Sequence, residues 1–491
     1  MRDRPSTLGA LDQQLHQPRS VRDELRANLV RKLRSGDPLF PGIVGYDETV
    51  IPQVVNAILA RHDIILLGLR GQAKTRLCRQ LTGLLDEAIP VIAGSALREH
   101  PLAPLTSASR KLVAEAGDDL PIEWLEPGQR YGEKLATPDV SVADLVGDVD
   151  PLKAAHRKLD LSDEEVIHYG IIPRTNHGIF CINEIPDLAP RIQVALLNLL
   201  EEQDIQIRGF PLRLPLDVMM VFTANPEDYT NRGSIITPLK DRIASQITTH
   251  YPASIDESRE ITADQSWNQR GDLLPAVSVP DFIADLVEAI AFVGRESEFI
   301  DQNSGVSARL AIAAQELLVS NVERRAITAP DDPACPRVVD CYQLVPAITG
   351  KVELVYEGEQ EGPGKVARHL IGSACRATFD SLFPSAIDGD DDPTLQDETY
   401  KPILDWFAKG NTVTVDDHQP YRDYCAQLDA VPGLRALVDA HLPQSEDSHR
   451  YSAMELVIEG LHQHSLLSKR DLDTGVTYGD MLRSMLEDSR F

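Results

Sequence analysis

The residues best suited to do chemistry form one short run, Gly68 to Thr75, with the sequence Gly-Leu-Arg-Gly-Gln-Ala-Lys-Thr. Glycines allow a tight turn, a lysine can reach phosphate oxygens, and a threonine hydroxyl can ligate Mg²⁺. Backbone N–H groups at the start of the helix that follows would hold the phosphates. The run therefore predicts a phosphate-binding loop. Its candidate binding residues are Gly68, Leu69, Arg70, Gly71, Gln72, Ala73, Lys74, Thr75 and Arg76.

One position departs from the pattern G-x-x-x-x-G-K-[ST], because Ala73 stands where the last glycine is expected. The added methyl group would hinder a close approach of the backbone to a phosphate. Taken alone, the run is equally compatible with an ordinary corner between a strand and a helix. The interpretation therefore depends on polar residues elsewhere in the chain.

Two later apolar runs end in polar side chains. Asn183 and Glu184 follow the run Ile179–Ile182, and Asn225 follows the run that begins at Val218. Ligands bind at the carboxyl edge of an open α/β sheet, where such side chains meet. We expect Glu184 to activate a water molecule, and Thr75, Asn183 and Glu184 to be the metal-site residues, although an amide brings no charge. For Asn225, a simple Asn-Pro turn is the alternative.

Three further residues are candidates for contact with a nucleotide. Arg242 lies in the run Leu-Lys-Asp-Arg-Ile, where a solvated Asp-Arg pair is the alternative. Arg309 falls in the first turn of a predicted helix, an unfavourable place for a cation unless an anion is near. Ile43 belongs to the apolar segment 40–45 ahead of the loop, which could enclose an adenine base or simply form a turn leading into the domain.

The elements that must position these residues alternate between apolar strands and helices. We expect strands at 64–67, 89–93, 179–182, 218–224 and 245–251, helices at 21–33, from 47, from 74 and at 189–202, a hairpin at 205–216, and a long irregular excursion at 94–132. Four prolines within the excursion favour that interpretation. From 254 to about 344 the pattern is almost wholly helical, and 399–491 is expected to be a small helical domain.

Composition limits the class of protein. The chain has 491 residues, with 48 basic against 76 acidic side chains and a net charge of −28. A surface this acidic repels the nucleic-acid backbone. We therefore expect a protein partner and no nucleic acid. No apolar run is long enough to span a membrane and no secretory signal is evident, which predicts a cytoplasmic protein. The six cysteines lack paired spacing and are expected to be reduced thiols.

Together these motifs resemble AAA+ ATPases, and among them the ATPase (I) subunit of magnesium chelatase and the related MoxR-type ATPases. The resemblance covers roughly residues 38–345. The segments that carry it are FPGIVGYDETV at 40–50, GLRGQAKT at 68–75, HGIFCINEI at 177–185, LLNLLEEQDIQIRG at 196–209, FTANPEDY at 222–229, LKDRI at 239–243 and, less specifically, SARLAIAA at 307–314.

The resemblance implies an α/β fold: a three-layer α/β/α phosphate-loop core, an α-helical lid and an additional C-terminal helical domain. The domains would be an N-terminal helical segment at 1–37, the nucleotide-binding domain at 38–253, the lid at 254–350, and a C-terminal extension at 351–491 with an acidic linker near 388–393. It also implies ATP and Mg²⁺ as cofactors, a homo-oligomeric ring, expected to be a hexamer, and a von Willebrand factor A-type partner protein.

The same resemblance implies a role for each candidate. Lys74 would contact the phosphates, Glu184 would be the base, and Asn225 would position the attacking water. Arg242 would act across a subunit boundary as an arginine finger, with Arg232 as the second choice, and Arg309 would reach the nucleotide from the lid. The hairpin at 205–216 would face the ring pore or a partner. The implied function is ATP hydrolysis coupled to remodelling of a partner protein, in metal insertion or protein maturation.

Two other classes stay open. An ATP-dependent transcription activator or helicase-like motor is disfavoured because the chain lacks a GAFTGA loop and a recognisable helix-turn-helix, and because it is acidic. A nucleotide-gated scaffold with weak hydrolysis is favoured by the departures at Ala73 and Asn183.

Overall fold

The computed structural model describes residues 4–12, 18–157, 164–207, 213–226, 234–267, 270–271, 273–386, 399–472 and 475–481. The chain divides into two compact units, residues 1–250 and residues 251–491. The predicted domain boundaries at 37, 253 and 350 stay predictions.

A five-stranded sheet forms the centre of the first unit. Its strand order is β11-β1-β10-β7-β4, and every neighbouring pair runs parallel. The strands are β1 (Ile64–Leu67), β4 (Tyr131–Leu135), β7 (Gly178–Asn183), β10 (Val218–Ala224) and β11 (Ser245–Thr248). Strands β1, β7 and β10 are buried along their whole length, as expected for a parallel sheet covered on both faces. The predicted strands at 64, 179, 218 and 245 are therefore confirmed.

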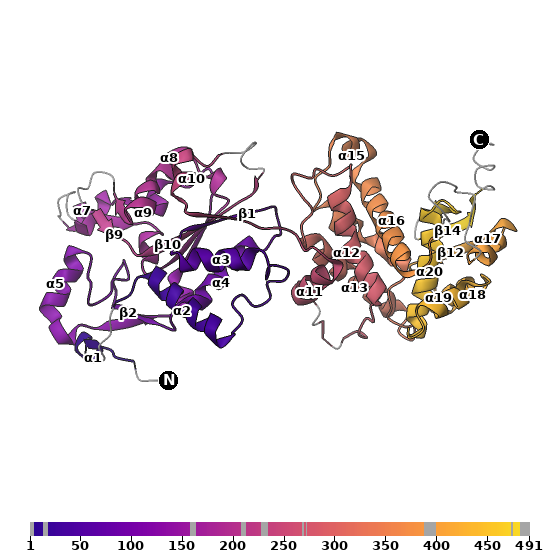
Figure 1. The fold of residues 1–491 in the computed structure, drawn as a ribbon, viewed down its shortest axis with the longest axis horizontal. Coiled ribbons are helices and arrows are strands. Elements are labelled where there is room, and N and C mark those ends of the chain that lie inside the picture. Colours follow the sequence, from indigo (N-terminus) through magenta and orange to yellow (C-terminus); the bar gives the residue numbers. More distant parts are fainter. Residues whose placement is uncertain are drawn as a thin grey trace. The chain divides into compact units, whose positions relative to one another are not determined.

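Side chains alternate between the two faces of this sheet. On β1, Ile64 and Leu66 enter one apolar core and Ile65 and Leu67 enter the other. Figure 1 shows helices on both sides of the sheet. The helices of the first face are α2 (Val21–Ser35), α3 (Val50–Leu59) and α4 (Lys74–Gln80); those of the second are α8 (Pro190–Ala195), α9 (Leu197–Glu201) and α10 (Thr237–Arg242). The three-layer α/β/α fold is confirmed.

The predicted irregular excursion at 94–132 is wrong, because it contains regular elements. Helix α5 (Ser107–Ala116) is followed by β3 (Ile122–Leu125), which pairs antiparallel with β2 (Ile89–Ile92) in a separate small sheet. Pro121 directly precedes β3, and Pro127 begins a 3-10 turn (Pro127–Arg130) that leads into β4. These two prolines therefore mark the ends of elements, where a missing N–H costs nothing.

Several predicted boundaries shift. The helix expected from 47 begins at Val50, the helix from 74 ends at Gln80, and the helix expected at 189–202 is two short helices, α8 and α9. The hairpin is confirmed by antiparallel pairing of β8 (Asp204–Gln206) with β9 (Arg213–Pro215). The remaining elements of the unit are α1 (Leu8–Asp12), α6 (Val142–Leu145), β5 (Gly147–Val149), α7 (Pro151–Arg157) and β6 (Ile167–Tyr169).

The N-terminal helix α2 is tied into the first unit by buried polar contacts. The Ser20 side chain caps its start and Gly36, with φ 76°, ends it. Both carboxylate oxygens of Glu24 accept hydrogen bonds from Arg130, at 2.7 and 2.6 Å, and Arg130 is fully buried. Arg22 pairs with Asp63 at 2.7 Å, also in the interior.

The second unit is mainly helical, as predicted, and has one continuous apolar core. A three-stranded antiparallel sheet, which the sequence pattern did not reveal, adds to it in the order β12-β14-β13. The strands are β12 (Val413–Asp416), β13 (Leu467–Asp471) and β14 (Gly475–Asp480). The helices are α11 (Ile255–Gln265), α12 (Asp281–Glu296), α13 (Arg309–Thr328), α14 (Val345–Thr349), α15 (Tyr356–Glu361), α16 (Pro363–Leu382), α17 (Lys401–Ala408), α18 (Tyr421–Asp429), α19 (Leu434–His441) and α20 (Asp447–Gln463).

Further sequence predictions concern an acidic linker, the cysteines and membrane-spanning segments. The acidic segment at 388–393 lies outside the described residues. The six cysteines are all free thiols, as predicted. None of the helices in the described ranges has the length and apolar character needed to cross a bilayer.

A buried charged network lies between α20 and the small sheet of the second unit. Glu459 accepts hydrogen bonds from Lys469 at 2.8 Å, from Tyr342 at 2.7 Å and from the Tyr478 hydroxyl. Glu459 is fully buried. Burial alone would raise the pKa of Glu459, but the Lys469 ammonium and these hydrogen bonds lower that pKa to about 2.

Removing the charge of Glu459 should destabilise the second unit. We expect Glu459→Gln to cost about 3–5 kcal/mol in the free energy of unfolding at pH 7, because Lys469 is left buried without its counter-ion. Adding Lys469→Met should restore much of that loss. In the wild type, the stabilisation should be present above the unfolded pKa of about 4.5 and be lost as the pH falls toward 2. Urea denaturation of the three proteins tests this, and equal midpoints for wild type and the single variant would contradict it.

Candidate functional site

The predicted phosphate loop connects β1 to α4. Two of its residues adopt left-handed backbone conformations, Gly71 with φ 76° and Ala73 with φ 53°. The first backbone hydrogen bond into α4 runs from the Leu77 N–H to the Ala73 carbonyl at 2.9 Å. The N–H groups of a first helical turn have no acceptor within their helix, so the loop can present them to an anion. Lys74 and Thr75 begin the helix as predicted.

The lysine of the loop meets the end of the neighbouring strand. The Lys74 ammonium donates to Asn225 Oδ1 at 2.7 Å, to the Leu69 carbonyl at 3.0 Å and to the Gly68 carbonyl. Lys74 is only 7% exposed. The parallel register explains the encounter: Leu67 lies opposite Ala224, so Gly68 and Asn225 leave the sheet together. Lys74 and Asn225 are 151 positions apart in the sequence.

The end of β7 lies one strand further along. Asn183 is buried, and its Oδ1 accepts a hydrogen bond from the Thr223 hydroxyl at 3.2 Å. The Glu184 N–H donates to the same hydroxyl at 3.2 Å. Glu184 has φ 55°, a left-handed conformation that is uncommon for a residue with a side chain. Thr223 therefore links the predicted metal and water motif to β10.

Sequence reasoning missed a carboxylate at this edge. Glu133 of β4 accepts a hydrogen bond from Asn183 Nδ2 at 2.6 Å. Glu133 also pairs with Arg79 of α4, whose Nε lies 2.9 Å from Oε2. The chain around it, Tyr-Gly-Glu-Lys-Leu, has no apolar run that would have indicated a strand. Glu133 could therefore not be recognised as a site residue from the sequence pattern.

The donor set fits Mg²⁺. The Thr75 hydroxyl, the Asn183 amide and the Glu184 carboxylate are hard oxygen donors, which Mg²⁺ prefers. Within the described ranges, no group of three or more His, Cys, Asp and Glu side chains could form a protein-only metal site.

Residues before and after the loop hold it against the sheet. The Tyr46 hydroxyl donates to the Gln72 carbonyl at 2.8 Å and lies 3.0 Å from the His250 carbonyl. Thr249 donates to Gln72 Oε1 at 2.8 Å. A Cβ at Gly68 would lie 1.9 Å from Thr249 Oγ1, so only glycine fits there. Ile43 lies in the apolar core with α2, α3 and α4.

The arginine candidates belong to several different elements. Arg242 ends α10 and pairs with Glu201, the last residue of α9, at 2.6 Å. Arg309 is exposed and starts α13 in the second unit, as the sequence predicted. Arg232 lies outside the described residues. Arg70 and Arg76 belong to the loop and to the first turn of α4.

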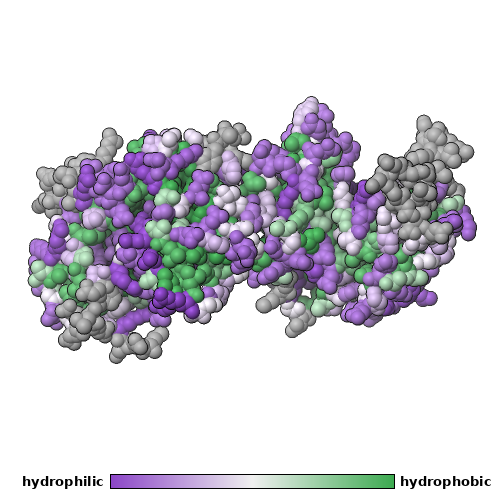
Figure 2. Space-filling view, in the orientation of Figure 1, coloured by the Kyte–Doolittle hydropathy of each residue, from purple (hydrophilic) through white to green (hydrophobic). Residues whose placement is uncertain are grey.

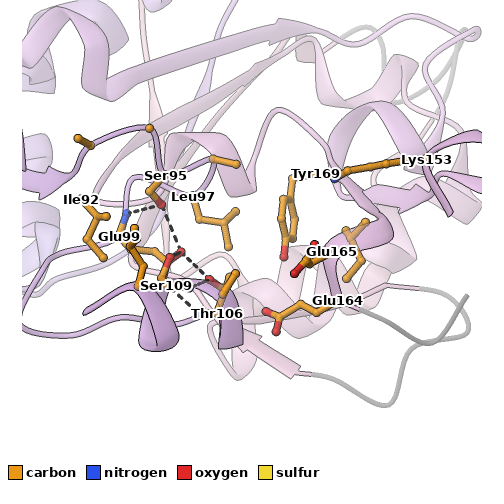
Figure 3. Close-up of a pocket in the computed structure, with 16 residues that line it drawn as sticks. Ile92, Ser95, Leu97, Glu99, Thr106, Ser109, Lys153, Glu164, Glu165 and Tyr169 are labelled. Carbon is orange, nitrogen blue, oxygen red and sulfur yellow. Dashed lines mark hydrogen bonds between the residues drawn. The ribbon is translucent and has the colours of Figure 1, made fainter. Parts of the chain in front are cut away.

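A separate cavity in the first unit has a different set of lining residues. It has a volume of about 460 Å³ and is lined by residues between Ile92 and Tyr169. Figure 3 shows Glu99 with Ser95, Thr106 and Ser109 on one side, and Tyr169 with Glu164 and Glu165 across from them. Glu99 is 1% exposed and accepts hydrogen bonds from the hydroxyls of Ser95, Thr106 and Ser109 and from two backbone N–H groups. Its carboxylate therefore fixes the loop that precedes α5.

Comparisons with known proteins agree with this geometry. Residues 122–243 match the family described as AAA domain, dynein-related subfamily. The matched range contains β4, β7, β10 and α10, and thus Asn183, Glu184, Asn225 and Arg242, but not the phosphate loop. The first unit is thus an AAA+ P-loop α/β fold.

Individual proteins match more weakly. The hydrogenase transcriptional regulatory protein HoxA of Cupriavidus necator is 31% identical over 96 residues, which are 19% of this chain and only 20% of that protein. NtrX from Brucella abortus in complex with ADP is 13% identical with a TM-score of 0.37, over 75% of this chain and 66% of that chain. A complex of magnesium chelatase subunits BchI and BchD gives 16% identity and a TM-score of 0.34, over 66% of this chain and 98% of that chain.

The backbone conformation of Ala73 yields a test. A left-handed conformation costs a residue with a Cβ about 1–2 kcal/mol relative to glycine. We therefore expect Ala73→Gly to tighten nucleotide binding or to leave it unchanged. The matched variant Gly71→Ala places a Cβ at φ 76° and should weaken binding about tenfold. Titration with a fluorescent ATP analogue measures both, and weaker binding by Ala73→Gly would contradict the expectation.

Proposed function

We propose that this chain is an ATPase that binds ATP and Mg²⁺ at the carboxyl edge of its central sheet and hydrolyses the γ-phosphate. The observation that carries the proposal is the contact of 2.7 Å between Lys74 and Asn225. It joins the ammonium of a phosphate loop to a polar strand end in a domain of the AAA+ class. A lysine held among backbone carbonyls and an amide oxygen can exchange these acceptors for phosphate oxygens.

The remaining residues supply the other requirements of phosphoryl transfer, which are positioning and charge neutralisation. Bound Mg²⁺ would neutralise phosphate charge, with Thr75 and Asn183 as the residues that hold it. Glu184 would take the proton of the attacking water. Asn225 would orient that water, and Lys74 would neutralise the charge of the γ-phosphate oxygens. Tyr46 and Thr249 would keep the loop in place through Gln72.

The active unit would be a homo-oligomeric ring, expected to be a hexamer. Arg242 is held by Glu201 within its own chain, at a partly exposed position from which a neighbour's nucleotide could attract it. Such surface pairs contribute only about 0–1 kcal/mol, so an exchange of partners costs little. On α3, Ile51, Val55 and Leu59 form a partly exposed apolar stripe at helical spacing, and Figure 2 shows apolar side chains gathered over this helix. Such a stripe suits contact with another subunit.

Hydrolysis would drive remodelling of a partner protein, as in MoxR-type ATPases and the magnesium chelatase I subunit. The expected partner is a von Willebrand factor A-type protein, and the expected compartment is the cytoplasm. Arg309 would sense the nucleotide from the lid, and the hairpin β8–β9 would face the pore or the partner. A porphyrin substrate is a narrower possibility that no residue of the described ranges specifically favours.

A second function, ATP-dependent activation of transcription, is favoured by one observation, the 31% identity to HoxA over 96 residues. The net charge of −28 disfavours binding to DNA. Measuring ATP hydrolysis with and without duplex DNA separates the two functions. Stimulation of several-fold by DNA at physiological salt would favour the activator.

Glu184 provides the test of hydrolysis itself. We expect Glu184→Gln to lower the rate of ATP hydrolysis by about 10²–10⁴-fold, because the general base is lost. ATP binding should be retained, since the variant keeps Lys74 and the loop. A coupled phosphate-release assay and a nucleotide titration measure the two quantities. Equal, negligible hydrolysis by wild type and variant would instead favour a nucleotide-gated scaffold.

Mixing variants tests whether Arg242 acts between subunits. Arg242→Ala and Glu184→Gln should each be inactive alone, whereas a mixture should regain hydrolysis. In mixed rings, a site with an intact Glu184 meets the intact Arg242 of a neighbour. Lys240→Ala, which removes an exposed cation from the same helix, serves as the control and should behave as wild type. A mixture as inactive as its components would contradict a role across the subunit boundary.

A further inference from the structure

The magnesium motif lacks charge at Asn183, and the strand beside it carries a carboxylate. Strand β4 pairs with β7 so that Glu133 lies opposite Cys181 and Leu135 lies opposite Asn183. Residues two apart on a strand share one face of the sheet, so Glu133 and Asn183 point the same way. Cys181 packs in the core formed with α2, α3 and α4, which identifies the face as the one covered by the phosphate-loop helix.

The hydrogen bonds of Asn183 fix which way its amide points. Its nitrogen donates to Glu133 Oε1 at 2.6 Å, and its oxygen accepts from Thr223 at 3.2 Å. An aspartate at position 183 would place one of its carboxylate oxygens about 2.6 Å from the Glu133 carboxylate. Like charges so close raise the pKa of one of them and disfavour the pair. An amide at 183 therefore fits a site that already has its negative charge at 133.

Glu133 is also tied to the phosphate-loop helix. Arg79 contacts both of its carboxylate oxygens, at 2.9 and 3.2 Å. Arg79 follows Thr75 by four residues, one helical turn, so both lie on one face of α4. The Arg79 side chain is 64% exposed and that of Glu133 22%. So exposed an ion pair contributes only about 0–1 kcal/mol, so it does not prevent Glu133 from acting on the buried Asn183.

We propose that Glu133 supplies the magnesium site with the negative charge that Asn183 lacks, transposed by one strand and in addition to the charge of Glu184. Glu133 acts as a positioning residue: it orients the Asn183 amide and supplies the charge that favours a divalent cation beside the nucleotide. The inference rests on the proposed ATPase function, since it assigns a residue to the metal requirement of that same site.

The test is the Mg²⁺ concentration at which a fluorescent ATP analogue is half bound, a measurement that does not depend on turnover. Glu133→Gln should raise this concentration about tenfold, the effect of one nearby charge on a divalent cation. The swap Glu133→Gln with Asn183→Asp should return it to within about threefold of wild type, because the charge is restored one strand away.

Arg79→Ala is the matched control, because it removes the same ion pair and leaves the carboxylate in place. It should leave the Mg²⁺ requirement unchanged or lower it. A rise equal to that of Glu133→Gln would show that the ion pair matters only for structure and would overturn the proposal. An unchanged requirement in Glu133→Gln, or a swap that restores nothing, would overturn it as well.

Thermal unfolding provides a second measurement that remains valid if Glu133→Gln folds poorly. Asn183→Asp alone should lower the melting temperature through repulsion from Glu133, and adding Glu133→Gln should restore it. A melting temperature that is not restored would contradict the transposed charge.

The ATPase proposal and the proposal for Glu133 fail in different ways. A wild-type chain that binds no nucleotide refutes the ATPase function, whereas normal binding with an unmoved Mg²⁺ requirement refutes only the role of Glu133.

Discussion

The parallel register of β1, β10 and β7 is the constraint on which the candidate site depends. It aligns Leu67 with Ala224 and Phe222 with Ile182, so three strands end at nearly the same level. The residues that follow these three strands are therefore brought together at the carboxyl edge of the sheet. The strands themselves are held in register by side chains that alternate between two apolar cores, since a shift of one residue would turn every side chain to the wrong face.

The charged and polar side chains at this edge come from several neighbouring strands and contact one another. Lys74 is held by β10 through Asn225, and Asn183 is held between Thr223 of β10 and Glu133 of β4. The two contacts of Asn183 link adjacent strands, and the contact of Lys74 links helix α4 to the end of β10. A substitution at one strand end therefore changes the environment of its neighbour, and single variants here need paired variants for their interpretation.

The sequence predicted the parts of the fold that have a strong pattern. Buried strands such as Ile64–Leu67 are continuous apolar runs, so the sequence also indicated which residues follow them at the edge of the sheet. Strand β4 could not be predicted because it lies at the edge of the sheet, is only partly buried and mixes charged residues with glycine. Glu133 was missed for that reason alone. In the second unit, the short strands β13 and β14 are held by packing against α20 and by antiparallel pairing, which local sequence does not encode.

The contacts of α2 bear on where the first unit begins. Arg22 and Glu24 of this helix neutralise Asp63 and Arg130 in the interior of the first unit. A shortened chain that starts after this helix would keep Asp63 and Arg130 as buried charges without counter-ions, at a cost of several kcal/mol each. Asp63 directly precedes β1, and Arg130 directly precedes β4. Loss of the first thirty-odd residues would thus disturb the two strands that carry the phosphate loop and Glu133, so the unit of folding extends well upstream of the chemistry it supports.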